Sequence, residues 1–238
     1  MSLDLNAFKL TSSVLEYRYA SNFLIWDRVG SFWSNLLTNY PAATLKTAEP
    51  NKTHVKISSD LDGVVSIDRA FVSSAGRKPN RQALIDFAEP FTRTLIANLN
   101  VTSFTRIGYR TVFSHSFSEK SAASEYFFTN CVPRQFESSY FGIEGAPTEP
   151  ELGWRWEGNT LGCHVRIGAR TINWDFDLPA DAPLTEAPDS SRTQHSVNID
   201  IDYYAHADTD VEQVNIKDLL ESWARVTRRD IGKMFNGR

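Results

Sequence analysis

The feature that most constrains the fold is a succession of strand-like runs separated by short turns. Within these runs apolar and polar residues alternate, as in Val14–Ala20, where Glu16 and Arg18 alternate with Leu15 and Tyr17. Such alternation is typical of a strand that has one buried and one polar face. Strands that follow one another through short turns favour antiparallel pairing. The sequence therefore predicts a mostly antiparallel sheet, with a mixed sheet as the alternative.

The strand-like runs extend through most of the chain. They are predicted at residues 14–20, 43–48, 53–58, 64–73, 104–117, 139–145, 152–157, 161–168, 170–177 and 196–205. Turn-forming pairs separate the later runs, at Gly158-Asn159 and at Gly168-Ala169. Leu178–Ser191 contains three prolines and is predicted to be the longest and most mobile internal loop.

Long amphipathic segments interrupt the strands. Helices are predicted at residues 22–39, 80–98, 119–131 and 215–235. Trp33 and Trp223 occupy the centres of their apolar stripes, so both are predicted to lie in the core. Pro90 either kinks one long helix or marks the first turn of a shorter one. The fold class is therefore α+β, with the helices at 22–39 and 216–235 packed on one face of the sheet.

Length and composition are those of an ordinary globular protein. The chain has 238 residues, 41% of them hydrophobic, which predicts a single domain over 1–238 or two intimately packed halves, 1–117 and 118–238. The formal net charge is −4, whereas nucleic-acid-binding proteins are usually basic, so nucleic acid is not an expected partner. The chain shows neither a leader peptide nor an apolar run of about 20 residues, and the two cysteines match no zinc spacing. A cytoplasmic location, away from the membrane, is predicted.

Two strands carry pairs of charged residues an even number of positions apart. Arg106 and Arg110 share one face of the run at 104–117, together with Phe104, and Asp200 and Asp202 share one face of a later run. Charged groups are costly to bury unless they meet opposite charge. The arginines and aspartates are therefore predicted to lie together on one face of the same sheet, with the apolar residues between them on the opposite, helix-covered face.

His164 and Arg166 form a further row on another predicted strand, and Arg170 continues it. Cross-strand ion pairs, each contributing about 0.2–1 kcal/mol, would explain all of these charges without a function. The alternative is a polar groove in which arginines bind a phosphate or carboxylate. In that interpretation the candidate ligand-binding residues are Arg106, Arg110, Asp200, Asp202, His164 and Arg166.

The aspartates could instead hold a metal ion. Asp200 and Asp202, with Asp175 and Asp177 on a neighbouring strand, offer the oxygen ligands that magnesium favours. That arrangement would support a metal-assisted hydrolase or a nucleotide-processing enzyme. However, no metal-binding loop accompanies these residues, and phosphate-binding and hydrolase motifs are absent. No cofactor is predicted, and whether the chain is an enzyme stays open.

The order of these motifs resembles that of a sporadically distributed family of uncharacterised bacterial proteins. The resemblance rests on Arg106, Gly108 and Arg110, which form an Arg-x-Gly-x-Arg strand, and on Asp200 and Asp202, which form an Asp-x-Asp strand before the last helix. It implies an α+β fold. The leading functional interpretation is a non-enzymatic binding or interaction protein, and the family's patchy distribution implies that it is accessory to a bacterial mobile-element or defence locus.

The match departs from the family in several places. Thr111 stands where the family usually has Tyr, and Ile199 stands where it has Leu. Of the family's N-terminal strand, only Glu16 has a counterpart here. The resemblance therefore covers about the last two thirds of the chain and supplies no activity. The partner that it leaves open is an unknown protein or a small anionic ligand, and the chain could also form an oligomer.

Overall fold

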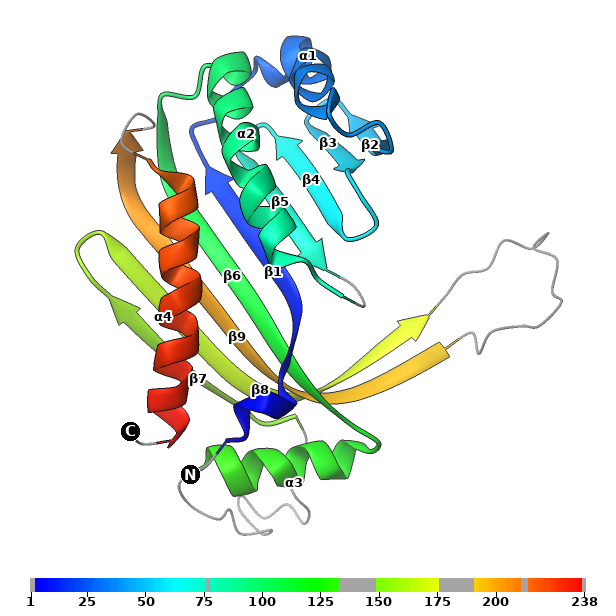
Figure 1. The fold of residues 1–238 in the computed structure, drawn as a ribbon, viewed down its shortest axis with the longest axis vertical. Helices are drawn as coiled ribbons and strands as arrows, with labels where there is room; N and C mark the ends of the chain where they lie inside the picture. Colours follow the sequence, from blue (N-terminus) through cyan, green and yellow to red (C-terminus); the bar gives the residue numbers. More distant parts are fainter. Residues whose placement is uncertain (1–2, 76–77, 133–148, 176–190, 211–213, 237–238) are drawn as a thin grey trace, which may run out of the picture.

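A computed structural model of the chain describes residues 3–75, 78–132, 149–175, 191–210 and 214–236. These residues form one nine-stranded sheet in which every neighbouring pair of strands is antiparallel. Its strand order is β2-β3-β4-β5-β1-β6-β9-β8-β7, and four helices pack on it (Figure 1). The predicted α+β fold class is confirmed.

The strands are β1 (Lys9–Arg18), β2 (Thr44–Glu49), β3 (Lys52–Lys56), β4 (Leu61–Ser66), β5 (Arg69–Ala75), β6 (Ser103–Phe117), β7 (Glu151–Glu157), β8 (Leu161–Asp175) and β9 (Ser191–Asp210). The helices are α1 (Ile25–Leu37), α2 (Arg81–Leu99), α3 (Lys120–Cys131) and α4 (Ile216–Asn236), and a short 3-10 helix spans Leu5–Ala7. Among the described residues, no helix is long and apolar enough to cross a membrane.

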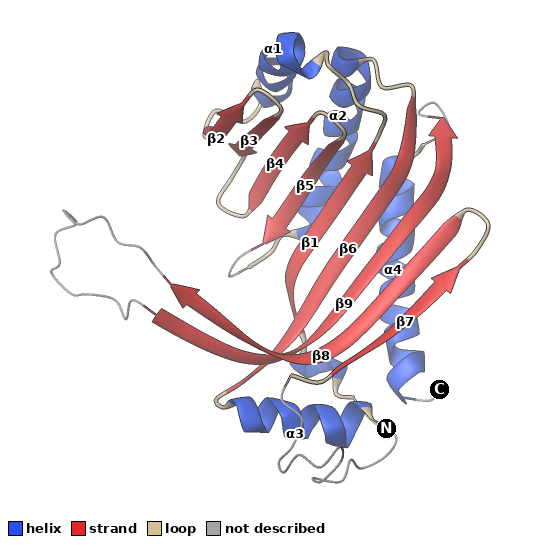
Figure 2. Ribbon diagram, turned by 180° about the vertical axis from the view of Figure 1, so that it is seen from behind, coloured by secondary structure: helices blue, strands red, loops and turns tan. Residues whose placement is uncertain are grey.

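The two faces of the sheet differ. Helices α1, α2 and α4 lie along one face, which we call the helix-covered face, as the views from the two sides show (Figures 1 and 2). Seen from behind in Figure 2, the strands lie in front of these helices, and we call this side the open face. Helix α3 lies at the end of the sheet where β8 and β9 bend away from the other strands (Figure 2).

The core lies between the sheet and its helices. Many strand residues that point to the helix-covered face are fully buried, among them Leu15, Tyr17 and Tyr109. Trp33 on α1 and Trp223 on α4 retain only 7% and 5% of their exposure, so the prediction that both lie in the core is confirmed. A second buried cluster joins β8 and β9 to α3 and the end of α4.

Helix α2 runs unbroken through Pro90, so the alternative of one long helix is correct. The side chain of Asn80 caps its start by accepting a hydrogen bond from the Ala83 N–H at 3.0 Å. Asn100 ends the helix in the left-handed conformation, with φ 50°. This conformation is one that asparagine tolerates better than most residues.

Two strand boundaries differ from the prediction. The predicted strand 64–73 is in fact β4 and β5, joined by a tight turn at residues 67–68, where the Ser66 hydroxyl bonds to Asp68 and to the Arg69 carbonyl. The predicted strands 161–168 and 170–177 form one strand, because β9 pairs with β8 continuously through Gly168-Ala169. The predicted turn at Gly168-Ala169 is therefore wrong.

Strict alternation also fails at the start of β6. The pairing of β6 with β9 shifts register between Phe104 and Arg106, a bulge that breaks the two-residue period. Phe104 is consequently fully buried against Tyr17, on the face opposite to Arg106. The predicted strand 139–145 lies outside the described residues, as does the predicted loop Leu178–Ser191 except for Ser191, which begins β9.

Candidate functional site

The charged residues are brought together by the three neighbouring strands β6, β9 and β8. In the β6–β9 register, Arg110 lies opposite Asp202 and Val112 lies opposite Asp200. In the β8–β9 register, Arg166 lies opposite Asp200 and His164 lies opposite Asp202. Directly paired residues of antiparallel strands project from the same face of the sheet. The predicted meeting of the arginines and aspartates on one face is therefore confirmed.

Asp200 binds two arginines. The Arg110 Nε and Nη2 atoms donate to its two oxygens at 2.7 Å each, which is the two-point geometry that a guanidinium and a carboxylate favour. Arg166 Nη2 donates to the Oδ2 atom of the same aspartate from the other side. The Asp200 side chain is only 10% exposed, whereas those of Arg110 and Arg166 are 46% and 32% exposed. A buried carboxylate thus holds two half-exposed cations.

Arg106 forms a second set of ion pairs beside the first. It donates to Glu16 on β1 at 2.9 Å and to Asp202 on β9 at 2.7 Å, and its guanidinium lies 5.0 Å from the centre of the Tyr204 ring. The guanidinium occupies the space where a Cβ atom on Gly108 would lie. The glycine of the Arg-x-Gly-x-Arg motif therefore lets Arg106 lie flat across β6.

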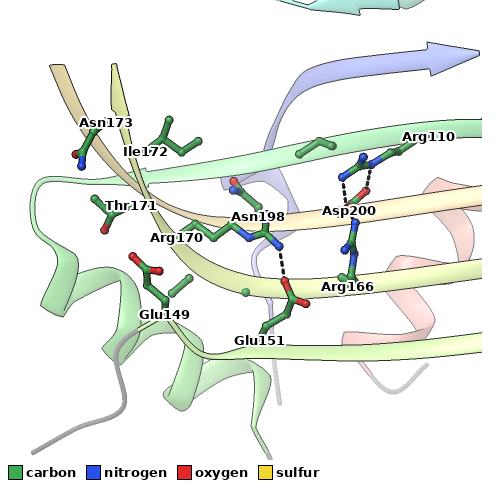
Figure 3. Close-up of a pocket in the computed structure, with 13 residues that line it drawn as sticks. Arg110, Glu149, Glu151, Arg166, Arg170, Thr171, Ile172, Asn173, Asn198 and Asp200 are labelled. Carbon is green, nitrogen blue, oxygen red and sulfur yellow. Dashed lines mark hydrogen bonds and ion pairs between the residues drawn. The ribbon is translucent and has the colours of Figure 1, made fainter. Parts of the chain in front are cut away.

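A pocket of about 750 Å³ opens on the open face where β8 and β9 bend (Figure 3). Its volume falls within the range of sites for small molecules. Charged side chains of both signs line it, together with amide, hydroxyl and apolar groups. The lining residues are Arg110, Val112, Glu149, Glu151, Arg166, Gly168, Ala169, Arg170, Thr171, Ile172, Asn173, Asn198 and Asp200.

The three arginines and three carboxylates that line the pocket are unevenly paired. Arg170 donates to Glu151 on the neighbouring strand β7, and Lys120 of α3 lies 3.5 Å from Glu149, so each of these glutamates has its own cation. Asp200, by contrast, is shared between Arg110 and Arg166. Two half-exposed guanidinium groups therefore share one carboxylate at this wall of the pocket, and the charge of Asp202 also acts on Arg110.

The two aspartates have opposite pKa shifts. Burial alone would raise the pKa of Asp200, but the hydrogen bonds and charges of Arg110 and Arg166 hold it below its ordinary value. For Asp202, burial is the largest effect and the charge of Asp200 adds to it, so its pKa is raised despite Arg106. Asp200 is therefore the more firmly ionised of the two carboxyl groups.

His164 and Asp202 line a second, shallower hollow of about 400 Å³ on the same face, with Arg106, Arg155 and Tyr204. Here the Tyr204 hydroxyl donates to Glu157 at 2.7 Å, and Arg155 Nε donates to that hydroxyl at 3.3 Å. All six predicted ligand-binding residues thus lie on the open face, but they line two hollows. Arg110, Arg166 and Asp200 line the larger one, whereas Arg106, His164 and Asp202 line the smaller one.

The donor atoms do not form a metal centre in the part of the chain that the structure describes. No group of three or more His, Cys, Asp or Glu side chains converges there. The oxygens of Asp200 accept hydrogen bonds from guanidinium groups, whose positive charge would repel a cation. Asp177 lies outside the described residues, and so does the side chain of Asp175.

The paired tryptophans of β7 lie on the helix-covered face. Trp154 is partly buried and packs against the buried cluster under α3 and α4. Trp156 is 50% exposed and borders an apolar hollow of about 310 Å³ beside α4. The pair therefore divides into one ring packed against the core and one surface ring.

Sequence reasoning missed the glutamates that complete the site. Glu151 and Glu149 reach the pocket because β7 pairs with β8 through a register in which Glu151 lies opposite Gly168. Glu16 reaches Arg106 through the β1–β6 pairing. The alternation of β1 placed Glu16 on a polar face, but nothing local specified which strand would lie beside it.

The fold and site together define an α+β protein with an open antiparallel sheet and an arginine-lined polar pocket. No protein-family model matches the chain, and no curated protein matches its sequence. The resemblance to the bacterial family with the Arg-x-Gly-x-Arg and Asp-x-Asp strands accordingly stays a prediction.

Proposed function

We propose that this protein is a non-enzymatic binding protein that takes a small anionic ligand in the pocket on its open face. The observation that carries the proposal is the unequal pairing of Asp200 with Arg110 and Arg166. Two half-exposed guanidinium groups that share one carboxylate at a concave surface can bind a negative group, such as a carboxylate. The accessory role at a mobile-element or defence locus is part of the same proposal, to be tested by the gene neighbourhood.

Hydrogen-bonding capacity supports the same conclusion. A guanidinium has five N–H donors, and within the described residues Arg110 donates only through Nε and Nη2, both to Asp200. Its Nη1 atom is available to a ligand. Asn198 and Thr171 add neutral polar groups to the lining, which suits a ligand that carries hydroxyl or amide groups beside its anion.

The metal-assisted hydrolase has no comparable support. Such an enzyme would need carboxylate oxygens facing a cation, whereas both aspartates of the motif accept hydrogen bonds from arginines. The arginines are the groups that face the open pocket, which favours binding an anion over activating water on a metal.

A calorimetric titration tests the proposal. Glucuronate, as a hydroxylated monocarboxylate, and inorganic phosphate are titrated into the protein at constant ionic strength, since screening weakens exposed charge pairs. Binding of either probe should weaken about tenfold or more in Arg110→Ala and Arg166→Ala, because each removes a charged hydrogen-bond donor.

Arg18→Ala is the matched control. Arg18 lies on the open face and its side chain is 53% exposed, but it does not line the pocket. Its removal should leave the dissociation constant unchanged. If Arg110→Ala and Arg166→Ala bind the probes with the affinity of the native protein, the ion pairs of these arginines with Asp200 only stabilise the sheet. The proposal would then be wrong.

A further inference from the structure

Strand β7 is an edge of the sheet with regular, outward-pointing backbone groups. It is the last strand in the sheet order of the described residues. Ala169 N donates to Pro150 O and Gly158 N donates to Leu161 O, so the even-numbered residues of this segment bond to β8. The β7–β8 register has no bulge, so alternation turns the N–H and C=O groups of Glu151, Gly153 and Arg155 away from the sheet.

This edge carries the charges of Glu151, Arg155 and Glu157 but lacks several other features that prevent sheet edges from pairing. Such edges are commonly blunted by proline, lysine or a bulge, and β7 has none of these between residues 151 and 157. Trp156 of β7 points to the helix-covered face and is 50% exposed. The strand can therefore accept another strand, and its sequence indicates which one.

We propose that β7 pairs antiparallel with β7 of a second copy of this chain, about a two-fold axis at Gly153. On the open face, this register places Glu151 of each copy opposite Arg155 of the other. On the helix-covered face it places Leu152 opposite Trp154, again twice, because the axis repeats each contact. Moving the axis to Leu152 would leave Glu151 opposite Gly153, without a charged partner.

Moving the two-fold axis toward Glu157 gives registers with less favourable contacts between side chains. An axis at Trp154 would set Glu151 against Glu157 in both halves, and an axis at Arg155 would set that arginine against itself. Like charges directly opposite one another destabilise a strand pair. An axis at Trp156 would restore opposite charges but would pair only the last residues of the strand. Within residues 151–155, charge and apolar pattern thus select the axis at Gly153. Beyond these residues the same register sets Glu157 opposite Glu149, and each of these glutamates has a cation of its own chain beside it, Arg155 and Lys120.

The side chains are accessible for these contacts. Glu151 is 41% exposed and Arg155 is 67% exposed, and their present partners are Arg170 and Glu157 of the same chain. Gly153 has no side chain, so none stands between the two strands at the axis. The resulting dimer has one continuous sheet, with the open faces and polar pockets of both copies on the same side.

Charge reversal at the two positions gives a decisive test. The masses of the native protein, of E151R, of R155E and of the double variant E151R/R155E are measured by light scattering from micromolar to millimolar concentration. The native protein should reach twice the mass of the single chain. Each single variant sets like charges opposite each other twice and should raise the dissociation constant of the dimer about 100-fold or more.

The double variant restores opposite charges across the axis and should dimerise again, although it does not restore the Arg170–Glu151 pair within the chain. Rescue therefore separates the interface from any local effect on folding, which circular dichroism monitors. Glu49→Arg reverses an exposed charge on β2, the other edge of the sheet, and should leave the dimer intact.

A native protein that stays monomeric at millimolar concentration would overturn the proposal. So would single variants that dimerise as the native protein does, because the contact would then lie elsewhere. Amide hydrogen exchange at Gly153 and Arg155 adds a local readout. Exchange should slow with rising concentration in the native protein, and slow exchange that is independent of concentration would mean that another part of the same chain covers the edge.

Discussion

Arg110 and Asp200 form a two-point ion pair across strands β6 and β9, with both hydrogen bonds at 2.7 Å. The two residues are 90 positions apart in the sequence. Because the aspartate is buried and the arginine is half-exposed, the pair aims a cation at solvent while its anion stays inside. The stability and the pH response of the sheet should depend on this arrangement.

Asp200→Asn removes the charge with little change of shape. At pH 7 we expect the free energy of unfolding to fall by about 1–3 kcal/mol, since the arginines can regain water but their charged hydrogen bonds are lost. Asp200 has a lowered pKa in the folded protein, so its contribution is present above its ordinary pKa of 3.8 and is lost as pH falls through the folded value. Urea unfolding from pH 7 downward should show the variant and the native protein converging. An equal difference at every pH would contradict this account, and Asp86→Asn, exposed on α2, serves as the control.

Asp202→Asn should cost less than Asp200→Asn at pH 7. The pKa of Asp202 is raised by burial, so the folded state favours its neutral form. The stability that this shift contributes is present below the ordinary pKa of 3.8 and is lost as pH rises through the folded value. The same unfolding experiment compares the two variants, and a larger loss for Asp202→Asn would reverse the assignment of the two environments.

Trp33→Ala and Trp223→Ala should each lower the free energy of unfolding by about 3–5 kcal/mol, because each leaves a large cavity in the core. Trp33 also donates from Nε1 to Thr53 at 2.8 Å, and that buried hydroxyl would lose its donor. Chemical denaturation measures both losses. Trp26, 59% exposed on α1, provides a matched truncation, and Trp26→Ala should cost about 1 kcal/mol or less.

Gly108→Ala should destabilise the protein by about 1–3 kcal/mol, because the new Cβ atom would occupy the position of the Arg106 guanidinium. Arg106 would then leave Glu16 and Asp202. Thermal unfolding checks the effect against Gly30→Ala, where nothing lies within 4 Å and the helix gains a better helix former. We expect Gly30→Ala to raise stability by about 0.5–1 kcal/mol, opposite in sign. If Gly108→Ala is as stable as Gly30→Ala, the Arg106 guanidinium can move away from the new Cβ atom without a loss of stability.

Neither cysteine should react with thiol reagents at pH 8 while the protein is folded. Burial raises the pKa of Cys131 to about 12 and that of Cys163 to about 11, and the thiolate is the reactive form. A disulfide reagent should label no thiol in buffer and two thiols in urea. Rapid labelling of the folded protein would place one of them at the surface.

The parts of the fold that the sequence predicts are those with a local signal. Helical spacing locates α1 and α4. The even spacing within Arg106/Arg110 and within Asp200/Asp202 predicts that each pair shares a face. Opposite charge then predicts that the pairs meet, and they do.

The remainder depends on pairing between distant strands. The continuity of β8 through Gly168 is imposed by β9, and the bulge beside Phe104 is visible only in the β6–β9 register. Glu151 enters the pocket through the β7–β8 pairing. Such registers are set by contacts between residues far apart in sequence, so no local pattern specifies them.

The position of β6 between β1 and β9 has a consequence for how the chain folds. Strand β9 follows β6 in the sequence by roughly 90 residues, so one long edge of β6 can be paired only after most of the chain has been synthesised. Non-local strand pairing carries a large loop-closure entropy, and sheets of this kind fold in milliseconds to seconds. During synthesis, the first half of the chain exposes an unpaired edge that carries Arg106 and Arg110. These charges would disfavour edge-to-edge aggregation until β9, with its aspartates, arrives.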